Sequence, residues 1–529
     1  MSTSTPSSLW PSPAAPPSAV VPHAGARRWI RALTPSFADC FFVALMAWLF
    51  ICGASGWKSL LADGDTGWHI RTGQYILAHH AVPSQDLFSF SKPGAPWFAW
   101  EWLSDVALAA LFQWGGLKAI TLAAGTLIAL YATVLLRYAL WLGANALLAA
   151  LVTLLAVGAS SMHFLARPHL VTLLLLPACL WLVQADLRKN TRWIWWLVPV
   201  SAVWTNLHGG VFMFLACLAL FVAGQLIDSW LGRPRWAAVW RHGVLLGGCA
   251  LATLVNPYGI RLHAHVLEYL RSDWIRNVIQ EFQAPTFRSE GQLQFEVLLV
   301  AGLVVTGFLF RQRRASDALC ILFLAHSSLT SVRHAPLYAA VAAPLIASEL
   351  SAWWNHWSDG LPRKSVVRIL RQIGQDIVPA FRRNTLWPAL VVLILAALNA
   401  PLKWPHDFPG ENFPLDMIHS HAGLLQSGRL LTTDQWGDYI IYSFYPKQKV
   451  FVDGRSDFYG EALGQDYLHL TQGAYDWRAI LERYGFQIAL LPVDLPLSTL
   501  LKRDPEWRLA NDDHHALLFV RLGPQRPPN

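Results

Sequence analysis

Long apolar runs recur in this chain from near residue 38 to near residue 400, each of about 17 to 25 residues, the length that crosses a bilayer as a helix. Hydrophobic residues make up 54% of the 529 residues, whereas only 14% are charged. A soluble domain of average composition carries about 25% charged residues. These values exclude a soluble enzyme, a disordered protein and a fibrous repeat. They predict a polytopic α-helical membrane protein.

About eleven transmembrane helices are expected. Every second connection between them is rich in Lys and Arg, and the densest cluster lies at 363–383. Because such loops stay on the cytoplasmic side, this pattern predicts a cytoplasmic N-terminus and an extracytoplasmic tail in the cell (inner) membrane. The net charge of +8 comes from these loops, so no nucleic-acid partner is expected. The expected spans lie near 36–54, 117–136, 144–160, 168–185, 193–207, 210–230, 242–256, 293–310, 316–332, 335–351 and 386–400.

The chain divides into three parts. Residues 1–35 begin with a segment rich in Ser, Pro and Ala and are expected to form a disordered cytoplasmic tail. Residues 36–400 hold the spans, with a large first outer loop at 55–116. Residues 401–529 are expected to form an extracytoplasmic α/β domain, because strand-like runs (KVFVDGR, FQIALLPVD, HALLFVRL) alternate there with helix-like stretches near 416–427 and 476–485.

Polar and ionisable residues gather in the five loops expected on the outer side. Ionisable groups near a membrane are costly to bury, so their default interpretation is functional. The alternatives are solvated turns for the carboxylates, satisfied polar groups for the histidines and lipid headgroup contacts for the arginines. The candidates are Asp63, Asp65, His69, Arg71 and Glu101 in the first loop, followed by Arg167, His169, Asn206, His208, Glu281, Arg333 and His334 in the later ones.

These residue types suit group transfer from a lipid-borne donor. We expect the carboxylates Asp65, Asp63 and Glu101 to be catalytic, because a carboxylate can deprotonate an acceptor hydroxyl or amide. Carboxylates also hold divalent cations, so Asp63 and Asp65 are the candidate ligands if Mg²⁺ or Mn²⁺ is required. Arginines and histidines can neutralise a phosphate leaving group as charge builds on it.

The arrangement resembles the GT-C class of membrane glycosyltransferases, which includes the oligosaccharyltransferases and protein mannosyltransferases. Asp65 occupies the position of the class's first-loop catalytic aspartate. The tail sequence Asp434-Gln-Trp436-Gly437-Asp438-Tyr439 is similar to the Trp-Trp-Asp-Tyr-Gly motif of the oligosaccharyltransferase catalytic subunit, and Val278-Ile-Gln-Glu281 to its Thr-Ile-x-Glu motif. The resemblance implies a polyprenyl-phosphate- or diphosphate-linked sugar as donor.

Two departures from the oligosaccharyltransferase pattern leave questions open. A Gly replaces one Trp of the tail motif, and Ile440 follows its Tyr. The second outer loop, near 161–167, lacks the acidic pair that oligosaccharyltransferases use for metal. The acceptor can therefore be a protein, a lipid or a polysaccharide, and metal dependence is undecided.

The leading functional hypothesis is a glycosyltransferase that moves a lipid-linked sugar to an extracytoplasmic acceptor. Trp436, Asp438 and Tyr439 are expected to bind acceptor from the tail, the alternative for Trp436 being burial in the tail's own core. Two other classes compete: a transporter or flippase of a lipid-linked glycan, and a non-catalytic membrane scaffold. A transporter should place polar residues at mid-membrane depth and often contains an internal repeat.

Overall fold

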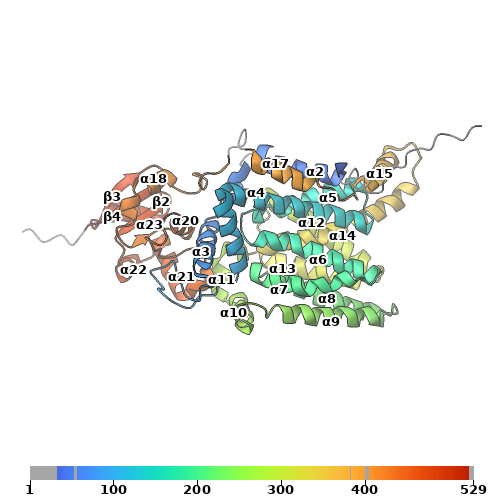
Figure 1. The fold of residues 1–529 in the computed structure, drawn as a ribbon, viewed down its shortest axis with the longest axis horizontal. Helices are drawn as coiled ribbons and strands as arrows, with labels where there is room; N and C mark the ends of the chain where they lie inside the picture. Colours follow the sequence, from blue (N-terminus) through green and yellow to red (C-terminus); the bar gives the residue numbers. More distant parts are fainter. Residues whose placement is uncertain (1–32, 53–55, 382, 399–403, 523–529) are drawn as a thin grey trace, which may run out of the picture.

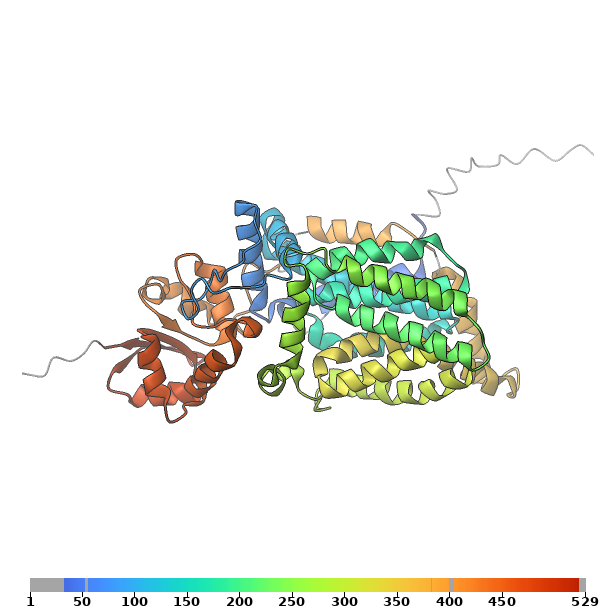
Figure 2. The same cartoon turned by 90° about the horizontal axis from the view of Figure 1, so that it is seen from below.

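The computed structural model describes residues 33–52, 56–381, 383–398 and 404–522, so nearly all of the expected disordered segment 1–35 lies outside the described residues. Figure 1 shows a bundle of long, nearly parallel helices with the tail packed against one end of it. A shorter helix of the first outer loop, α3 (Asp65–His79), lies between the two parts, as Figure 2 shows in blue.

Each of the eleven expected spans contains a helix in the part of the chain that the structure describes. Five, α4, α6, α8, α12 and α14, are long and apolar enough to cross a membrane, and four of the others are shorter apolar helices. That all eleven helices cross the membrane therefore stays a prediction. The helices are α2 (Phe37–Ala47), α4 (Trp102–Leu142), α5 (Ala146–Ala159), α6 (His169–Arg188), α7 (Leu197–Leu207), α8 (Val211–Trp230), α9 (Trp236–Ala252), α12 (Glu290–Arg311), α13 (Ala315–Thr330), α14 (Ala335–Asp359) and α17 (Trp387–Ala397).

Helix α4 is two helices joined at a kink. Gly115 and Gly116 leave helical geometry, and Gly116 has φ 61°, a conformation that costs glycine little. The kink falls where the second span was expected to begin, near residue 117. The stretch before it, from Trp102, belongs to the first outer loop and packs against α3.

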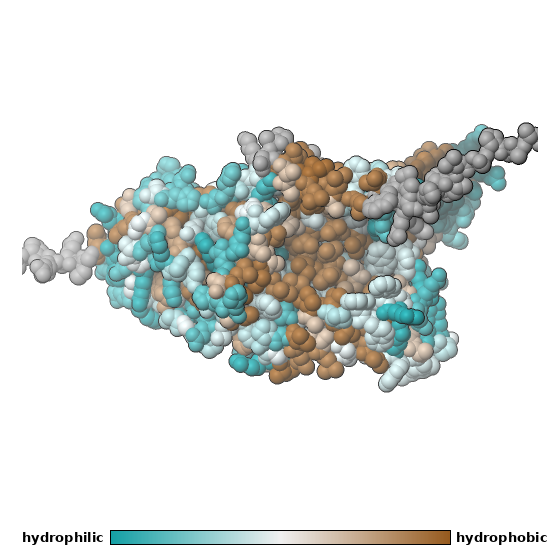
Figure 3. All heavy atoms as spheres, in the orientation of Figure 1, coloured by the Kyte–Doolittle hydropathy of each residue, from teal (hydrophilic) through white to brown (hydrophobic). Residues whose placement is uncertain are grey.

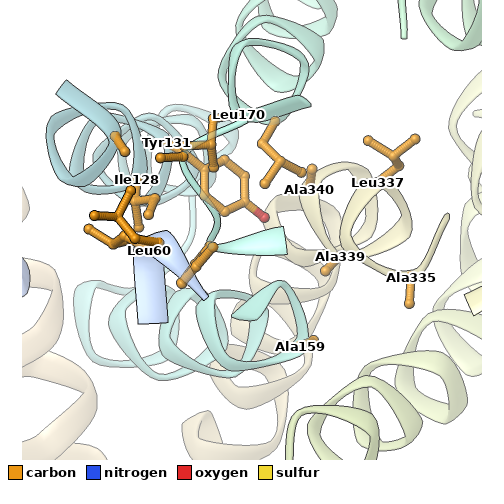
Figure 4. Packing of buried hydrophobic residues seen from close by; sticks show 14 of the residues in the cluster. Leu60, Ile128, Tyr131, Ala159, Leu170, Ala335, Leu337, Ala339 and Ala340 are labelled. Carbon is orange, nitrogen blue, oxygen red and sulfur yellow. The ribbon is translucent and has the colours of Figure 1, made fainter. Parts of the chain in front are cut away.

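An apolar surface covers the middle of the bundle. Figure 3 shows it between the polar tail and the polar opposite end. On α12, Val297, Val300 and Val304 are each more than half exposed, which suits contact with lipid chains rather than water. Inside the bundle, Tyr131 of α4 packs among Leu170 of α6 and the small residues of α14, which allow close helix contact (Figure 4).

The tail contains a four-stranded sheet of order β1-β2-β4-β3, in which only β1 and β2 are parallel. Two of the three strand-like runs form strands, β2 (Ile488–Pro492) and β4 (Ala516–Arg521). The run KVFVDGR does not, because Val450 pairs only singly, with Ser89 of the first outer loop and Leu430. The remaining elements are β1 (Leu430–Leu431), β3 (Trp507–Asp512), α18 (Leu415–Ser420), α19 (Ala422–Leu425), α20 (Asp434–Phe444), α21 (Ser456–Gln472), α22 (Trp477–Tyr484) and α23 (Pro496–Arg503).

The first outer loop fixes the tail to the bundle. Phe90 donates its backbone N–H to the carbonyl of Val450 at 2.9 Å, and the Val450 N–H bonds to the Phe88 carbonyl at 3.0 Å. Arg71 on α3 donates through Nε to the carbonyl of Tyr442 on α20 at 2.7 Å. These contacts hold tail residues directly over the end of the bundle.

We expect the tail to lie outside the membrane and the opposite end of the bundle to face the cytoplasm. Tyr475 is 96% exposed in the tail, and Asn190 is exposed beyond α6 at the basic end. In a chain whose six cysteines are replaced by alanine, Tyr475→Cys should react with an impermeant maleimide in intact cells. Asn190→Cys should react only after permeabilisation. The reverse pattern would invert the topology.

Candidate active site

Two cavities meet where the tail covers the bundle. The first, of about 450 Å³, lies among the outer ends of the spans and α10 (Ile260–Arg271). The second, of about 580 Å³, lies between the loop that follows α11 (Asp273–Val278) and the tail helix α21. The residues that line both cavities are Asp65, Arg167, Tyr269, Glu281, Phe282, Arg333, Gly454 and Ser456.

Asp65 stands at the boundary between the cavities. It is the first residue of α3, where the helix dipole stabilises a negative charge, and only 4% of it is exposed. Its Oδ2 lies 2.5 Å from Nη2 of Arg167. Asp63 supports the same arrangement: its Oδ1 accepts the Asp65 N–H at 2.8 Å, and its Oδ2 receives Nη1 of Arg167 at 2.9 Å.

The other oxygen of Asp65 faces the tail. Asp438 on α20 accepts the Gly454 N–H through Oδ1 at 2.9 Å, and its side chain bonds to that of Asp65. Neither Asp65 Oδ1 nor Asp438 Oδ2 receives a hydrogen bond from a described N–H or hydroxyl group. Burial, reinforced by the charge of Asp65, raises the pKa of Asp438 well above its usual range. Asp438 therefore carries the proton that the two carboxyl groups share.

Burial also raises the pKa of Asp65, to about 7, although the neighbouring Arg167 opposes the shift. A carboxylate with this pKa can accept a proton near neutral pH, as a general base must. Gly454 makes the close approach possible, since a Cβ at this position would overlap Asp65 Oδ1.

Glu101 lies deeper in the first cavity, between two histidines. Its carboxyl oxygens are 3.6 Å from Nε2 of His208 and 3.8 Å from Nε2 of His69. His208 accepts the Gly210 N–H and the Thr172 hydroxyl at Nδ1, so its proton is on Nε2 and points toward Glu101. Burial raises the pKa of Glu101 to about 8. At neutral pH Glu101 is mostly protonated, which favours a hydrogen-bonding role over that of a base.

The first cavity also contains the guanidinium of Arg333. Arg333 stacks on the Phe282 ring at 4.4 Å and reaches the Tyr269 hydroxyl at 3.4 Å, and it forms no ion pair with a described residue. His163 and His169 stand beside it in the lining, His169 bonding to the His163 carbonyl at 2.6 Å. His334 lines the same cavity. A guanidinium without a carboxylate partner is suited to a phosphate.

Two predicted acceptor-binding residues of the tail lie away from both cavities. Trp436 is 5% exposed and donates its indole N–H to the Asn412 carbonyl at 2.9 Å. Tyr439 is fully buried and donates its hydroxyl to Asp407 at 2.8 Å. Both side chains belong to the core of the tail, which is the alternative that the sequence left open for Trp436. Of the three predicted residues, Asp438 alone reaches the site, through Asp65. Asp434 and Gln435 of the same motif line the second cavity.

Three predicted residues of the loops support the site without lining a cavity. Arg71 bonds to the backbone of α20, as described above. Asn206 accepts the Trp102 indole N–H at 2.7 Å. His69 is buried, bonds to Asp105 at 2.5 Å and faces Glu101 through its other nitrogen. The predicted residues at the cavities are Asp63, Asp65, Glu101, Arg167, His169, His208, Glu281, Arg333 and His334.

Several residues that line the second cavity were not predicted from the sequence. Trp274 of α11 and Tyr459 and Tyr467 of α21 supply aromatic rings to its wall. Gly454 and Ser456 line both cavities. No local pattern in the sequence connects these residues to Asp65.

The first-loop carboxylates do not form a ready metal site. Asp63 and Asp65 both point at the Arg167 guanidinium, and Glu281 approaches it to 3.8 Å. Within residues 33–522, excluding the short gaps in the description, no group of three His, Cys, Asp or Glu side chains is arranged to hold a metal ion. The residues present therefore do not fit the divalent cation for which Asp63 and Asp65 were the candidate ligands.

The described fold is an apolar helix bundle with a C-terminal domain packed against one end of it. Two solved structures share this fold. The oligosaccharyltransferase AglB of Archaeoglobus fulgidus, in complex with an inhibitory peptide and a dolichol-phosphate, superposes with a TM-score of 0.53 at 11% identity, over 88% of this chain and 70% of that one. The predicted resemblance to the GT-C fold is thus confirmed.

The second solved structure is an Archaeoglobus fulgidus oligosaccharyltransferase tethered to an acceptor peptide containing the NVT sequon. It superposes with a TM-score of 0.53 at 10% identity, over 92% of this chain and 74% of that one. No protein-family model matches this chain, and no curated protein sequence does. The similarity is therefore one of fold.

Proposed function

We propose that this chain is a membrane glycosyltransferase that moves a sugar from a polyprenyl-phosphate- or diphosphate-linked donor to an extracytoplasmic acceptor. The observation that carries the proposal is the position of Asp65, a buried carboxyl with a pKa of about 7 that lines both cavities. A base at the junction of two binding sites can act on one substrate while it faces the other.

The first cavity suits the lipid-linked donor. Phe212 and Met213 of α8, Phe323 of α13 and Leu337 of α14 make one part of its wall apolar, where a prenyl chain can lie. Arg333 supplies a positive charge for the phosphate. One ligand that needs both surfaces at once is a lipid phosphate, and the archaeal neighbour AglB was solved with dolichol-phosphate.

The second cavity suits the acceptor. Trp274, Tyr459 and Tyr467 present aromatic rings, and Asp63 and Gln280 present hydrogen-bonding groups. Aromatic faces with polar edges bind sugar rings and peptide side chains alike, so the acceptor class is a protein, a lipid or a polysaccharide. The cavity lies against the tail, on the side that we expect to be extracytoplasmic.

The reaction follows from these positions. Asp65 takes a proton from the acceptor hydroxyl or amide, and the acceptor attacks the anomeric carbon of the donor sugar. The bond between that carbon and the phosphate oxygen breaks, and the lipid phosphate leaves with the bonding electrons. Arg333 stabilises the charge that builds on the phosphate. Glu101, which is protonated at neutral pH, can donate a hydrogen bond in the donor cavity.

Mass spectrometry of cell-envelope glycans and glycoproteins tests the proposal. Deletion of the gene should remove one glycan or glycosylated species, and the wild-type gene should restore it. A gene encoding Asp65→Asn should leave the species absent although the protein is present in the membrane at the wild-type level. Full restoration by Asp65→Asn would contradict the proposed reaction.

A further inference from the structure

Three carboxylates converge on a single guanidinium at the centre of the site. Arg167 reaches Asp65 at 2.5 Å, Asp63 at 2.9 Å and Glu281 at 3.8 Å. These partners come from different segments: the first outer loop supplies the aspartates, and the loop after α11 supplies the glutamate. Carboxylates brought together from distant segments need a shared proton or a cation between them, because their mutual repulsion in a buried site is otherwise uncompensated. At this cluster the cation is Arg167.

Two of these carboxylates come from stretches with oligosaccharyltransferase counterparts. Asp65 matches the first-loop aspartate, and Glu281 ends the stretch similar to the Thr-Ile-x-Glu motif. The second outer loop is where the two patterns differ, because the acidic pair for metal is missing there. At the end of that loop this chain has Arg167. The guanidinium of Arg167 lies at the point where Asp63, Asp65 and Glu281 meet.

We propose that Arg167 is a built-in cation that takes the place of a divalent metal ion between Asp63, Asp65 and Glu281. Its planar guanidinium group can bond to two carboxylates at once, as it does with Asp63 and Asp65. A guanidinium stays charged at every physiological pH and cannot dissociate. Arg167 is thus a positioning residue: it fixes Asp65 through Oδ2 and leaves Oδ1 on the side of Asp438 and Gly454.

Two consequences separate this arrangement from a metal site. The wild-type protein should bind no Mn²⁺ at this cluster, and chelators should change neither its melting temperature nor, resting on the proposed function, its transfer activity. Removal of the guanidinium should create a site that binds a divalent cation. Arg167→Ala leaves three carboxylates facing one another, a donor set that hard cations such as Mn²⁺ prefer.

Mn²⁺ binding to the full-length protein in nanodiscs, followed by electron paramagnetic resonance, tests the proposal. We expect Arg167→Ala to bind one Mn²⁺ that the wild type does not bind. The double variant Arg167→Ala with Asp65→Asn should lose this gain. Arg167→Lys, which keeps a positive charge, is the matched control and should behave like the wild type.

Two results would overturn the proposal. One is a wild-type protein that binds Mn²⁺ stoichiometrically, or melts at a higher temperature with it, in a manner that Asp65→Asn abolishes. The other is a folded Arg167→Ala protein with no gain in Mn²⁺ binding. If Arg167→Ala does not fold, the wild-type measurement alone still decides. Metal binding is read without any sugar substrate, so a failure of the proposed glycosyltransferase activity would be visible separately.

Discussion

Replacing Asp65 by asparagine should abolish sugar transfer while the protein still folds. Asparagine has nearly the same shape, and Arg167 keeps its contact with Asp63 at 2.9 Å, so the loop geometry should survive. The amide cannot accept the acceptor's proton. Loss of a general base typically lowers the rate about 100-fold or more. Initial rates of transfer from a lipid-linked donor, together with the melting temperature of the same preparation, measure both effects.

Asp438→Asn is the matched control for Asp65→Asn. Asp438 already holds a proton because burial and the charge of Asp65 raise its pKa, so an amide there replaces one neutral donor by another. We expect its activity to stay within a few-fold of the wild type. An inactive Asp438→Asn beside an active Asp65→Asn would exchange the roles of the two carboxyl groups.

The pH dependence has a predictable sign. As a base, Asp65 must be ionised, and burial raises its pKa to about 7. The value of kcat/KM should therefore fall as the pH drops below about 7, by about tenfold per pH unit, and should level off above it. A profile that is flat from pH 5 to pH 7 would separate Asp65 from the proton transfer.

Replacing Arg455 by leucine should cause the largest loss of stability. Arg455 is 3% exposed, and its Nη2 bonds to Asp86 of the first outer loop at 2.8 Å and to Asp453 of the tail at 2.7 Å. Its guanidinium also lies 4.5 Å from the Trp97 ring. Removal leaves two buried carboxylates without a counter-charge, and breaking a buried pair in this way costs about 3 to 5 kcal/mol.

Thermal unfolding and limited proteolysis of the tail measure the effect of Arg455→Leu. We expect a clearly lower melting temperature and faster cleavage between the tail and the bundle, because this ion pair joins the two. Arg483→Leu is the control in the same domain, since Arg483 pairs with Asp466 at the surface and should matter little. Equal effects of the two substitutions would contradict a joining role for Arg455.

The helices were predictable because a bilayer offers the backbone no water for hydrogen bonding. Backbone groups in a bilayer must bond within the segment, so an apolar run of sufficient length predicts a helix directly. The start of the second span near residue 117 was predictable for a related reason, since an apolar run follows Gly115 and Gly116. Asp65 could be named as a candidate because an ionisable group near a membrane is costly to bury and therefore rare.

The tail motif shows where sequence reasoning failed. Trp436, Asp438 and Tyr439 were expected to bind the acceptor together, with burial in the tail's own core as the alternative for Trp436. They lie on helix α20, where residues three apart share a face and residues two apart do not. Trp436 and Tyr439 therefore enter the tail's core together, while Asp438 points to Asp65.

Contacts between segments distant in the sequence could not be predicted either. Gly454 lies almost four hundred positions from Asp65, and its role depends on the absence of a Cβ atom beside that carboxylate. Arg71 was expected to bind substrate because an arginine in an outer loop suits an anion. The structure gives it the carbonyl of Tyr442 instead, and no local pattern distinguishes the two partners.

Transfer of a labelled sugar by the purified protein distinguishes a glycosyltransferase from a flippase. Polyprenyl-linked sugars extracted from cells that carry a radioactive sugar label would be mixed with the protein and with envelope acceptors in proteoliposomes. We predict that label leaves the lipid-extractable fraction and appears in the acceptor fraction, and that Asp65→Asn prevents this. The opposite result is that the label changes leaflet but stays on the lipid, equally with the wild type and with Asp65→Asn. This result would identify a flippase and contradict sugar transfer by Asp65.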